Sequence, residues 1–101
     1  MAEHESPEDE LASLRAEIDE IDQQIILLLG VRFRCTDMIG ELKQAHGMDL
    51  LDTRRESQQV ARIRRLAEEA GVPPELAENI LHEVIDTVVA HHTRLRERPY
   101  S

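Results

Sequence analysis

The sequence is nearly free of aromatic residues. Only 2% of its 101 residues are aromatic and none is tryptophan, whereas 41% are hydrophobic. A core must therefore be built from leucine, isoleucine and valine, and this length suffices for one domain. We expect a single domain over residues 1–101, with a flexible acidic tail at 1–6 and a flexible tail at 97–101.

Cysteine and long hydrophobic runs are also scarce. The one cysteine, Cys35, excludes an intrachain disulfide, and its apolar neighbourhood is typical of an inert buried thiol in a reducing compartment. No apolar run approaches the roughly 20 residues needed to span a bilayer, and the N-terminal segment is acidic, unlike a signal peptide. We therefore expect a cytoplasmic protein with no membrane partner.

Positive charge is outnumbered as well. The chain has 12 lysines and arginines against 21 aspartates and glutamates, a formal net charge of -9. Such a charge repels phosphate backbones, so we expect no nucleic-acid partner. The sequence also lacks a strand pattern, a glycine-rich phosphate loop and a Ser-His-Asp order, which leaves an all-helical fold and no nucleotide cofactor.

The first predicted helix is very long. Ser6 is the predicted N-cap, and Pro7 falls in the first turn. The helical periodicity continues to about Ala45, before Gly47. Its apolar stripe contains an arginine, Arg32, which is costly to bury unless its donors meet anions. This favours a buried anion site. The stripe runs Leu11, Leu14, Ile18, Ile21, Ile25, Leu28, Arg32, Cys35, Ile39 and Leu42.

Two shorter helices follow. A capping box at Thr53 to Glu56 starts the second, which ends at Gly71, and Pro73 or Pro74 opens a third that persists to about residue 96. The apolar face of the third helix runs Leu81, Ile85, Val88, His92 and Leu95.

The length of the first helix predicts an oligomer. Nearly forty residues at about 1.5 Å each give a rod of roughly 55 Å, whereas a compact globule of this size is about 30 to 35 Å across. Two rods side by side in a two-fold dimer would cover the stripe. An ordinary coiled coil, in which Arg32 only fixes the register, remains the alternative.

Other cations can join Arg32 at an anion site. Lys43 follows it by eleven residues, about 20° around the helix and roughly 16 Å along it, so both side chains can converge. Arg15 lies about 100° around and roughly 25 Å away, so it reaches only a partner's pocket in an antiparallel dimer. Arg55 and Glu56 lie in the first turn of the second helix, where free N–H groups also favour an anion. Taken singly, each residue is more simply explained as a solvated surface charge or, for Glu56, as a helix cap.

Together these residues resemble the all-helical chorismate mutase family over about residues 11–96. The resemblance implies intertwined homodimers of three-helix chains, which convert chorismate to prephenate in the shikimate pathway of aromatic amino acid biosynthesis by a Claisen rearrangement without cofactor or covalent intermediate. Its motifs are Leu14-Arg15, Ile18-Asp19, Ile21-Asp22, Leu27-Leu28-Leu29 with Arg32, Ile39-Gly40 with Lys43, and Asp52 with Arg55-Glu56.

The resemblance also implies roles for these residues. Arg32, with Arg15 of the partner subunit, would hold the two carboxylates of the substrate, and Arg55 would support them. Lys43 would donate to the ether oxygen as its bond to carbon breaks. Glu56 would accept from the ring hydroxyl, with the backbone at residue 52 beside it.

Two positions depart from the family pattern. His92 stands where the family has glutamine or glutamate beside the ether oxygen, and Val88 replaces a serine one turn earlier. An imidazole can donate a hydrogen bond as a neutral ring or as a cation, so it can replace the glutamine. A core histidine satisfied by a neighbouring group is the alternative interpretation.

The histidines do not predict a metal site. His82 is four residues from both Glu78 and Asp86 and can share a helix face with either, but a closed zinc site needs about four ligands and no further cluster supplies them. His91 and His92 diverge by about 100°. We therefore expect no metal.

Two other functions remain open. One is a related enzyme on the same scaffold, an isochorismate-pyruvate lyase or a mutase of 4-amino-4-deoxychorismate. The other is a non-catalytic helical dimerisation or regulatory module, for which Arg32→Leu would stabilise the dimer without loss of activity. The resemblance extends to members that work with a separate shikimate-pathway enzyme, which is therefore a candidate partner.

Overall fold

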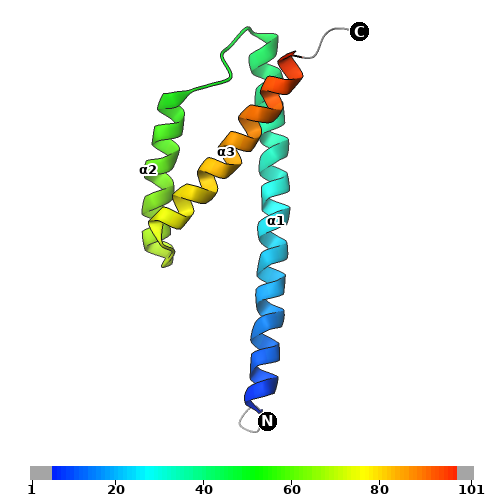
Figure 1. Cartoon of the computed structure of the whole chain (residues 1–101), viewed down its shortest axis with the longest axis vertical. Helices are drawn as coiled ribbons and strands as arrows, with labels where there is room; N and C mark the ends of the chain where they lie inside the picture. The colour runs from blue at the N-terminus through cyan, green and yellow to red at the C-terminus, as the bar shows by residue number, and fades with distance from the viewer. Residues whose placement is uncertain (1–5, 98–101) are drawn as a thin grey trace. The chain divides into compact units, whose positions relative to one another are not determined.

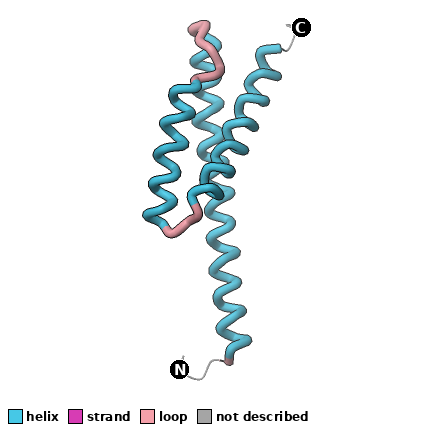
Figure 2. The backbone as a smooth tube through the Cα atoms, turned by 60° about the vertical axis from the view of Figure 1, so that its left-hand side comes forward, coloured by secondary structure: helices cyan, strands magenta, loops and turns pink. Residues whose placement is uncertain are grey.

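The computed structural model describes residues 6–97, which form three α-helices joined by short connections (Figures 1 and 2). The helices are α1 (Pro7–Ala45), α2 (Thr53–Ala70) and α3 (Pro74–Glu97), and the described residues contain no strand. The prediction of an all-helical chain with a very long first helix is thus confirmed. Of the two predicted tails, residues 1–5 and 98–101 lie outside the described residues. No helix within 6–97 is long and apolar enough to cross a membrane.

The chain divides into two compact units at Cys35 and Thr36, within α1. The described part of the first unit, residues 6–35, is a single stretch of helix. Its start matches the prediction, because the Oγ of Ser6 accepts a hydrogen bond from the backbone N–H of Asp9 at 3.1 Å. Acidic residues in the first turn add a favourable interaction with the helix dipole.

The apolar stripe of this unit is exposed in the single chain. Six of its leucines and isoleucines expose between 46% and 67% of their surface. Cys35, which we expected to be a buried thiol, is exposed as well. A helix with such a stripe does not bury enough apolar surface to be stable alone in water, so the stripe needs a covering surface. The six residues are Leu11, Leu14, Ile18, Ile21, Ile25 and Leu28.

The second unit begins with the last ten residues of α1. That helix ends where predicted, because Gly47 takes a positive φ of 65° and the backbone N–H of Met48 donates to the carbonyl of Lys43 at 2.7 Å. The next helix, α2, starts differently from the prediction. Its N-cap is Asp52, whose Oδ1 accepts from the backbone N–H of Arg55 at 3.0 Å, and Thr53 is already inside the helix. Aspartate competes well with threonine as a cap, which moves the start by one residue.

Glycine also ends α2. Gly71 has a φ of 75° in the left-handed region, its N–H donates to Glu68, and the N–H of Val72 donates to the carbonyl of Ala67 at 2.8 Å. These two bonds form a Schellman motif, which satisfies carbonyls that the helix end leaves free. The chain then turns directly into α3.

Contacts between α2 and α3 form the small core of this unit. Its buried apolar residues are Ala67 of α2 and Leu81 of α3. Of the apolar face predicted for α3, Leu81 and His92 are buried. Leu95 is 44% exposed and does not belong to the core of the single chain. The buried histidine is therefore the unusual member of this face, and it marks the candidate site.

Candidate functional site

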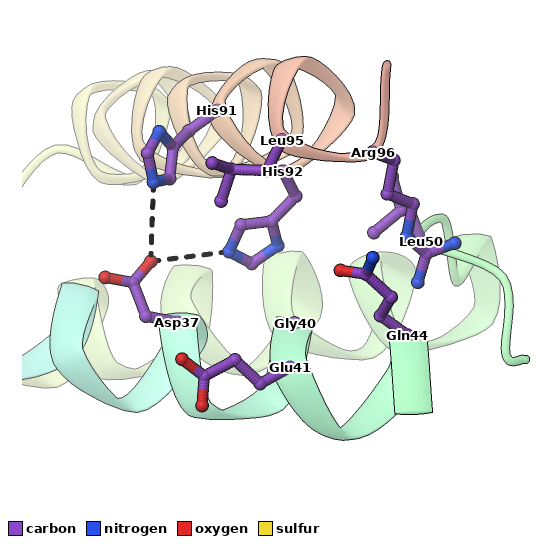
Figure 3. A pocket seen from close by; sticks show the side chains of 9 residues that line it. All are labelled: Asp37, Gly40, Glu41, Gln44, Leu50, His91, His92, Leu95 and Arg96. Carbon is purple, nitrogen blue, oxygen red and sulfur yellow. Dashed lines mark ion pairs between the residues drawn. The ribbon is translucent and has the colours of Figure 1, made fainter. Parts of the chain in front are cut away.

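A small pocket lies around His92, between the end of α1 and the end of α3 (Figure 3). Its volume is about 150 Å³. Among the residues predicted for the site, His92 is the one that lines it. The lining residues are Asp37, Gly40, Glu41, Gln44, Leu50, His91, His92, Leu95 and Arg96.

The imidazole of His92 faces a carboxylate of α1. Its Nε2 lies 3.5 Å from Oδ1 of Asp37, and the Nε2 of His91 lies 3.9 Å from the same oxygen (Figure 3). The His92 side chain is 10% exposed, and its Nε2 is buried without a hydrogen-bond partner. The carboxylate of Asp37 therefore lies where it can balance a positive charge on the imidazole of His92.

Glycine at position 40 makes room for this ring. A Cβ atom at Gly40 would lie 2.6 Å from Cε1 of His92 and under 3.0 Å from both ring nitrogens. Real Cβ contacts are essentially never that short, so α1 and the imidazole pack together only because residue 40 has no side chain. Gly40 is the buried residue of α1, which agrees with this close approach.

Lys43 and Arg96 both donate to backbone carbonyls of the connection that follows α1. The Nζ of Lys43 donates to the carbonyl of Leu50 at 3.3 Å, and Nη2 of Arg96 donates to the carbonyl of Met48 at 3.0 Å. Arg96 lines the pocket, and its Nε is buried without a hydrogen-bond partner. Lys43 does not line it, so the structure does not bring Lys43 and His92 together around this pocket.

Glu56 belongs to a second cluster, in which charges of opposite sign link α2 to α3. Its Oε1 lies 3.5 Å from Nδ1 of His82, whose Nε2 lies 3.3 Å from Oε2 of Glu78. Arg64 of α2 completes the cluster, with Nη1 3.0 Å from Glu78 and Nη2 3.4 Å from Glu75. We refer to these five residues as the α2–α3 charge cluster.

Two groups of this cluster have shifted pKa values. The hydrogen bond to Glu78 is the largest cause that raises the pKa of Arg64 above its usual value. The pKa of Glu75 is lowered, first by a hydrogen bond from its own backbone N–H at the start of α3 and then by Arg64. Both groups are at the surface, so each ion pair of Arg64 contributes little to the stability of the fold.

The other residues of the second unit that were predicted for the site are Asp52, Arg55 and Val88, and none of them lines the pocket around His92. Asp52 caps α2, and its carbonyl accepts from the backbone N–H of Glu56 at 3.0 Å. Arg55 is exposed in the first turn of α2, and Val88 is half-buried on α3. The cap thus fixes the backbone that holds Glu56.

Arg15 and Arg32 lie in the first unit. Arg32 is half-buried and Arg15 is exposed. Within residues 6–35, neither guanidinium forms an ion pair with a carboxylate. The described residues of the first unit therefore do not supply the anion that full burial of Arg32 would require.

The sequence analysis missed Asp37 and Gly40 as neighbours of His92. Nothing local in the sequence identifies these two residues, because their proximity to His92 depends on how α3 crosses the end of α1. The link from His82 to Glu78 was recognisable from the spacing of four, but its continuation to Glu56 was not. Across residues 6–97 no group of three or more histidine, cysteine or carboxylate side chains is arranged to hold a metal ion.

The sequence of this chain is similar to those of known proteins. The family described as chorismate mutase type II matches residues 14–93, which include residues of all three helices. The chorismate mutase of Methanocaldococcus jannaschii is 31% identical over 90 residues, which cover 89% of this chain and 87% of that protein. This chain belongs to the chorismate mutase type II family, which confirms the resemblance drawn from its residues.

Longer relatives match this chain over part of their length. The T-protein of Enterobacter agglomerans is 37% identical over 76 residues, which cover 75% of this chain and 20% of that protein. The bifunctional chorismate mutase/prephenate dehydratase of Aquifex aeolicus is 33% identical over 91 residues, 87% of this chain and 25% of that protein. The chain thus spans between a fifth and a quarter of these two relatives.

Proposed function

We propose that this chain is a chorismate mutase, an isomerase that converts chorismate to prephenate by a Claisen rearrangement. The observation that carries the proposal is the match to a relative named chorismate mutase along 87% of that relative's length. We take residues 1–101 as one mutase domain, acting in the cytoplasm within aromatic amino acid biosynthesis.

The reaction requires binding and electrostatics more than acid–base chemistry. Chorismate is a flexible dianion, so the enzyme has to hold it in a compact shape in which the reacting carbons approach. Arg32, Arg55 and Arg15 of the partner subunit would bind the two carboxylates. Arginine suits this role, because its planar fork donates two parallel hydrogen bonds to a carboxylate and stays charged.

Positive charge near the ether oxygen would lower the barrier. As the carbon–oxygen bond breaks, negative charge grows on that oxygen, and donors already in place stabilise it without reorganising. Lys43 is the first such donor. His92 would be the second, replacing the glutamine or glutamate of other members, with Asp37 balancing its charge at 3.5 Å. Lys43 donates one of its three N–H groups to the carbonyl of Leu50 in the free chain, which leaves two donors for the substrate.

The opposite end of the substrate carries a hydroxyl group. Glu56 would accept a hydrogen bond from this hydroxyl, with the backbone of Asp52 beside it. The capping contact of Asp52 with the N–H of Arg55 supports this role, because it fixes the first turn of α2 from which Glu56 projects. Val88 would line the pocket where the family pattern has a serine. No cofactor or metal takes part in these steps.

We further propose that the active enzyme is a homodimer with shared sites. The exposed stripe of the first unit supports this, because burying a leucine or isoleucine contributes roughly 1.5–3 kcal/mol. A second copy of the same helix presents the same stripe and can cover it by two-fold symmetry. Arg15 would then bind substrate held mainly by the other chain. A separate shikimate-pathway enzyme is a further candidate partner.

The direct test is the turnover of chorismate by the purified chain. We expect its ultraviolet absorbance to fall and prephenate to be the product on chromatography, with activity lost in Arg32→Ala. Isochorismate and 4-amino-4-deoxychorismate are assayed alongside. Pyruvate and salicylate from isochorismate would instead assign a lyase, and turnover of the amino compound alone would assign the other mutase. If none of the three reacts, the chain is not this enzyme.

A further inference from the structure

The imidazole of His82 lies between two carboxylates from different helices. Its Nδ1 is 3.5 Å from Oε1 of Glu56 on α2, and its Nε2 is 3.3 Å from Oε2 of Glu78 on α3. The His82 side chain is 41% exposed, so it is accessible to solvent. None of the roles implied by the family resemblance falls on His82.

The contacts on both nitrogens select one protonation state of the ring. A neutral imidazole carries one N–H, so one of its nitrogens would point a lone pair at a carboxylate oxygen. Only the imidazolium donates toward both Glu56 and Glu78. The geometry of the ring therefore suits a cation between two anions.

Arg64 neutralises much of the charge of Glu78, so the positive charge of His82 interacts mainly with Glu56. Glu78 already receives a charge-assisted hydrogen bond from Nη1 of Arg64 at 3.0 Å, and Arg64 also contacts Glu75. The groups that face His82 or its partners are thus Glu56 and Arg64 from α2 and Glu75 and Glu78 from α3. Because Arg64 balances Glu78, the charge on His82 acts mainly on Glu56.

A carboxylate paired in this way discriminates between hydroxyl and ammonium groups. Its oxygens offer about four lone-pair positions, so Glu56 can still accept a hydrogen bond from a hydroxyl while it faces His82. An ammonium group would bring a second positive charge close to the imidazolium, and like charges repel. Without His82, Glu56 would be a free carboxylate and would attract the ammonium more strongly.

We propose that His82 is a specificity-determining positioning residue, which orients Glu56 and makes it select a hydroxyl-bearing dicarboxylate over the corresponding amino compound. This inference rests on the proposed function, in which Glu56 faces the hydroxyl of the substrate. His82 acts through Glu56 and need not touch the substrate.

The test compares two substrates on the chain of residues 1–101. The value of kcat/KM is measured for chorismate and for 4-amino-4-deoxychorismate with the unsubstituted chain, His82→Gln and His82→Lys. His46→Gln, in the connection after α1, is the matched control for loss of a histidine elsewhere. The ratio of the two values cancels the fraction of folded enzyme, so a variant that merely folds poorly does not change it.

We expect His82→Gln to shift the ratio toward the amino compound by roughly two- to fivefold, the range set by a partly exposed charge pair. His82→Lys keeps a cation beside Glu56 and should retain the original ratio, as should His46→Gln.

Two results overturn the inference, and they differ in meaning. If chorismate is turned over but the ratio in His82→Gln equals that of the unsubstituted chain, His82 does not set specificity and the proposed function stands. The same holds if neither protein turns over the amino compound. If the unsubstituted chain turns over neither compound, the proposed function fails, and the role of His82 fails with it.

Discussion

Gly40 and His92 are in such close contact that a methyl group at position 40 would lie 2.6 Å from the imidazole. This contact holds the end of α3 against the end of α1 in the second unit, and it turns Nε2 of His92 toward Asp37 (Figure 3). His92 is the residue proposed to replace the glutamine or glutamate of other family members. Its position against α1 thus depends on a glycine at residue 40.

Substitution of Gly40 by alanine should destabilise the second unit. The added Cβ forces the imidazole or the helix to move, and overpacking of this kind costs about 1–3 kcal/mol. The free energy of unfolding in urea measures the effect. Gly30→Ala is the control, because the nearest atom to its Cβ is 3.9 Å away and alanine is the better helix former. Equal effects of the two substitutions would show that the contact with His92 is unimportant.

The activity should depend on the proton of His92. If the imidazolium donates to the ether oxygen, kcat/KM for chorismate falls as pH rises past about 6.5, where histidine ordinarily titrates. A flat profile between pH 5 and 8 would mean that the cation is not required.

Removal of the Asp52 side chain should weaken the start of α2. Asp52→Ala removes the acceptor for the N–H of Arg55, and loss of an N-cap costs about 0.5–2 kcal/mol. Thr53→Ala should change stability by no more than about 0.5 kcal/mol, because Thr53 is an exposed residue inside the helix. Urea unfolding of both variants decides the matter. A larger loss in Thr53→Ala would restore the capping box first expected from the sequence.

Glu75 should contribute to stability at neutral pH but not in acid. Its pKa is lowered in the folded chain, so the ionised form is favoured by folding. That contribution is present above the unfolded value of about 4.5 and disappears as the pH falls through the folded value. Glu75→Gln should therefore be less stable than the unsubstituted chain at pH 7 and equal to it near pH 2. Urea midpoints at both pH values test this, with the exposed Glu83→Gln as control. A difference that persists unchanged in acid would contradict the assignment.

The helices were predictable because their signals are local. Ser6, Gly47 and Gly71 end or cap helices through contacts within a few residues, and the sequence gives these residues directly. Asp52 was missed as a cap because it competes with Thr53 one residue later, and both are good caps. Boundaries of this kind depend on small differences in free energy between neighbouring residues.

The surroundings of the candidate site were less predictable. The sequence identified His92 through its place on the apolar face of α3, but Asp37 lies 55 residues earlier and meets it only through the packing of α3 on α1. The cluster around His82 has the same origin, since Glu56 and His82 come from different helices. Periodicity gives the face of a helix, whereas the register between two helices depends on tertiary packing.

The sharpest single measurement is complementation between two inactive variants. Arg15→Ala and Arg32→Ala are assayed for prephenate formation separately, and again after the two are unfolded together, mixed in equal amounts and refolded. In a mixed dimer, one site combines the intact Arg32 of one chain with the intact Arg15 of the other. We expect each variant alone to be inactive and the mixture to recover about a quarter of the unsubstituted activity, since random pairing makes half of the dimers mixed. No recovery would contradict the shared site, and no prephenate from the unsubstituted chain would contradict the proposed function itself.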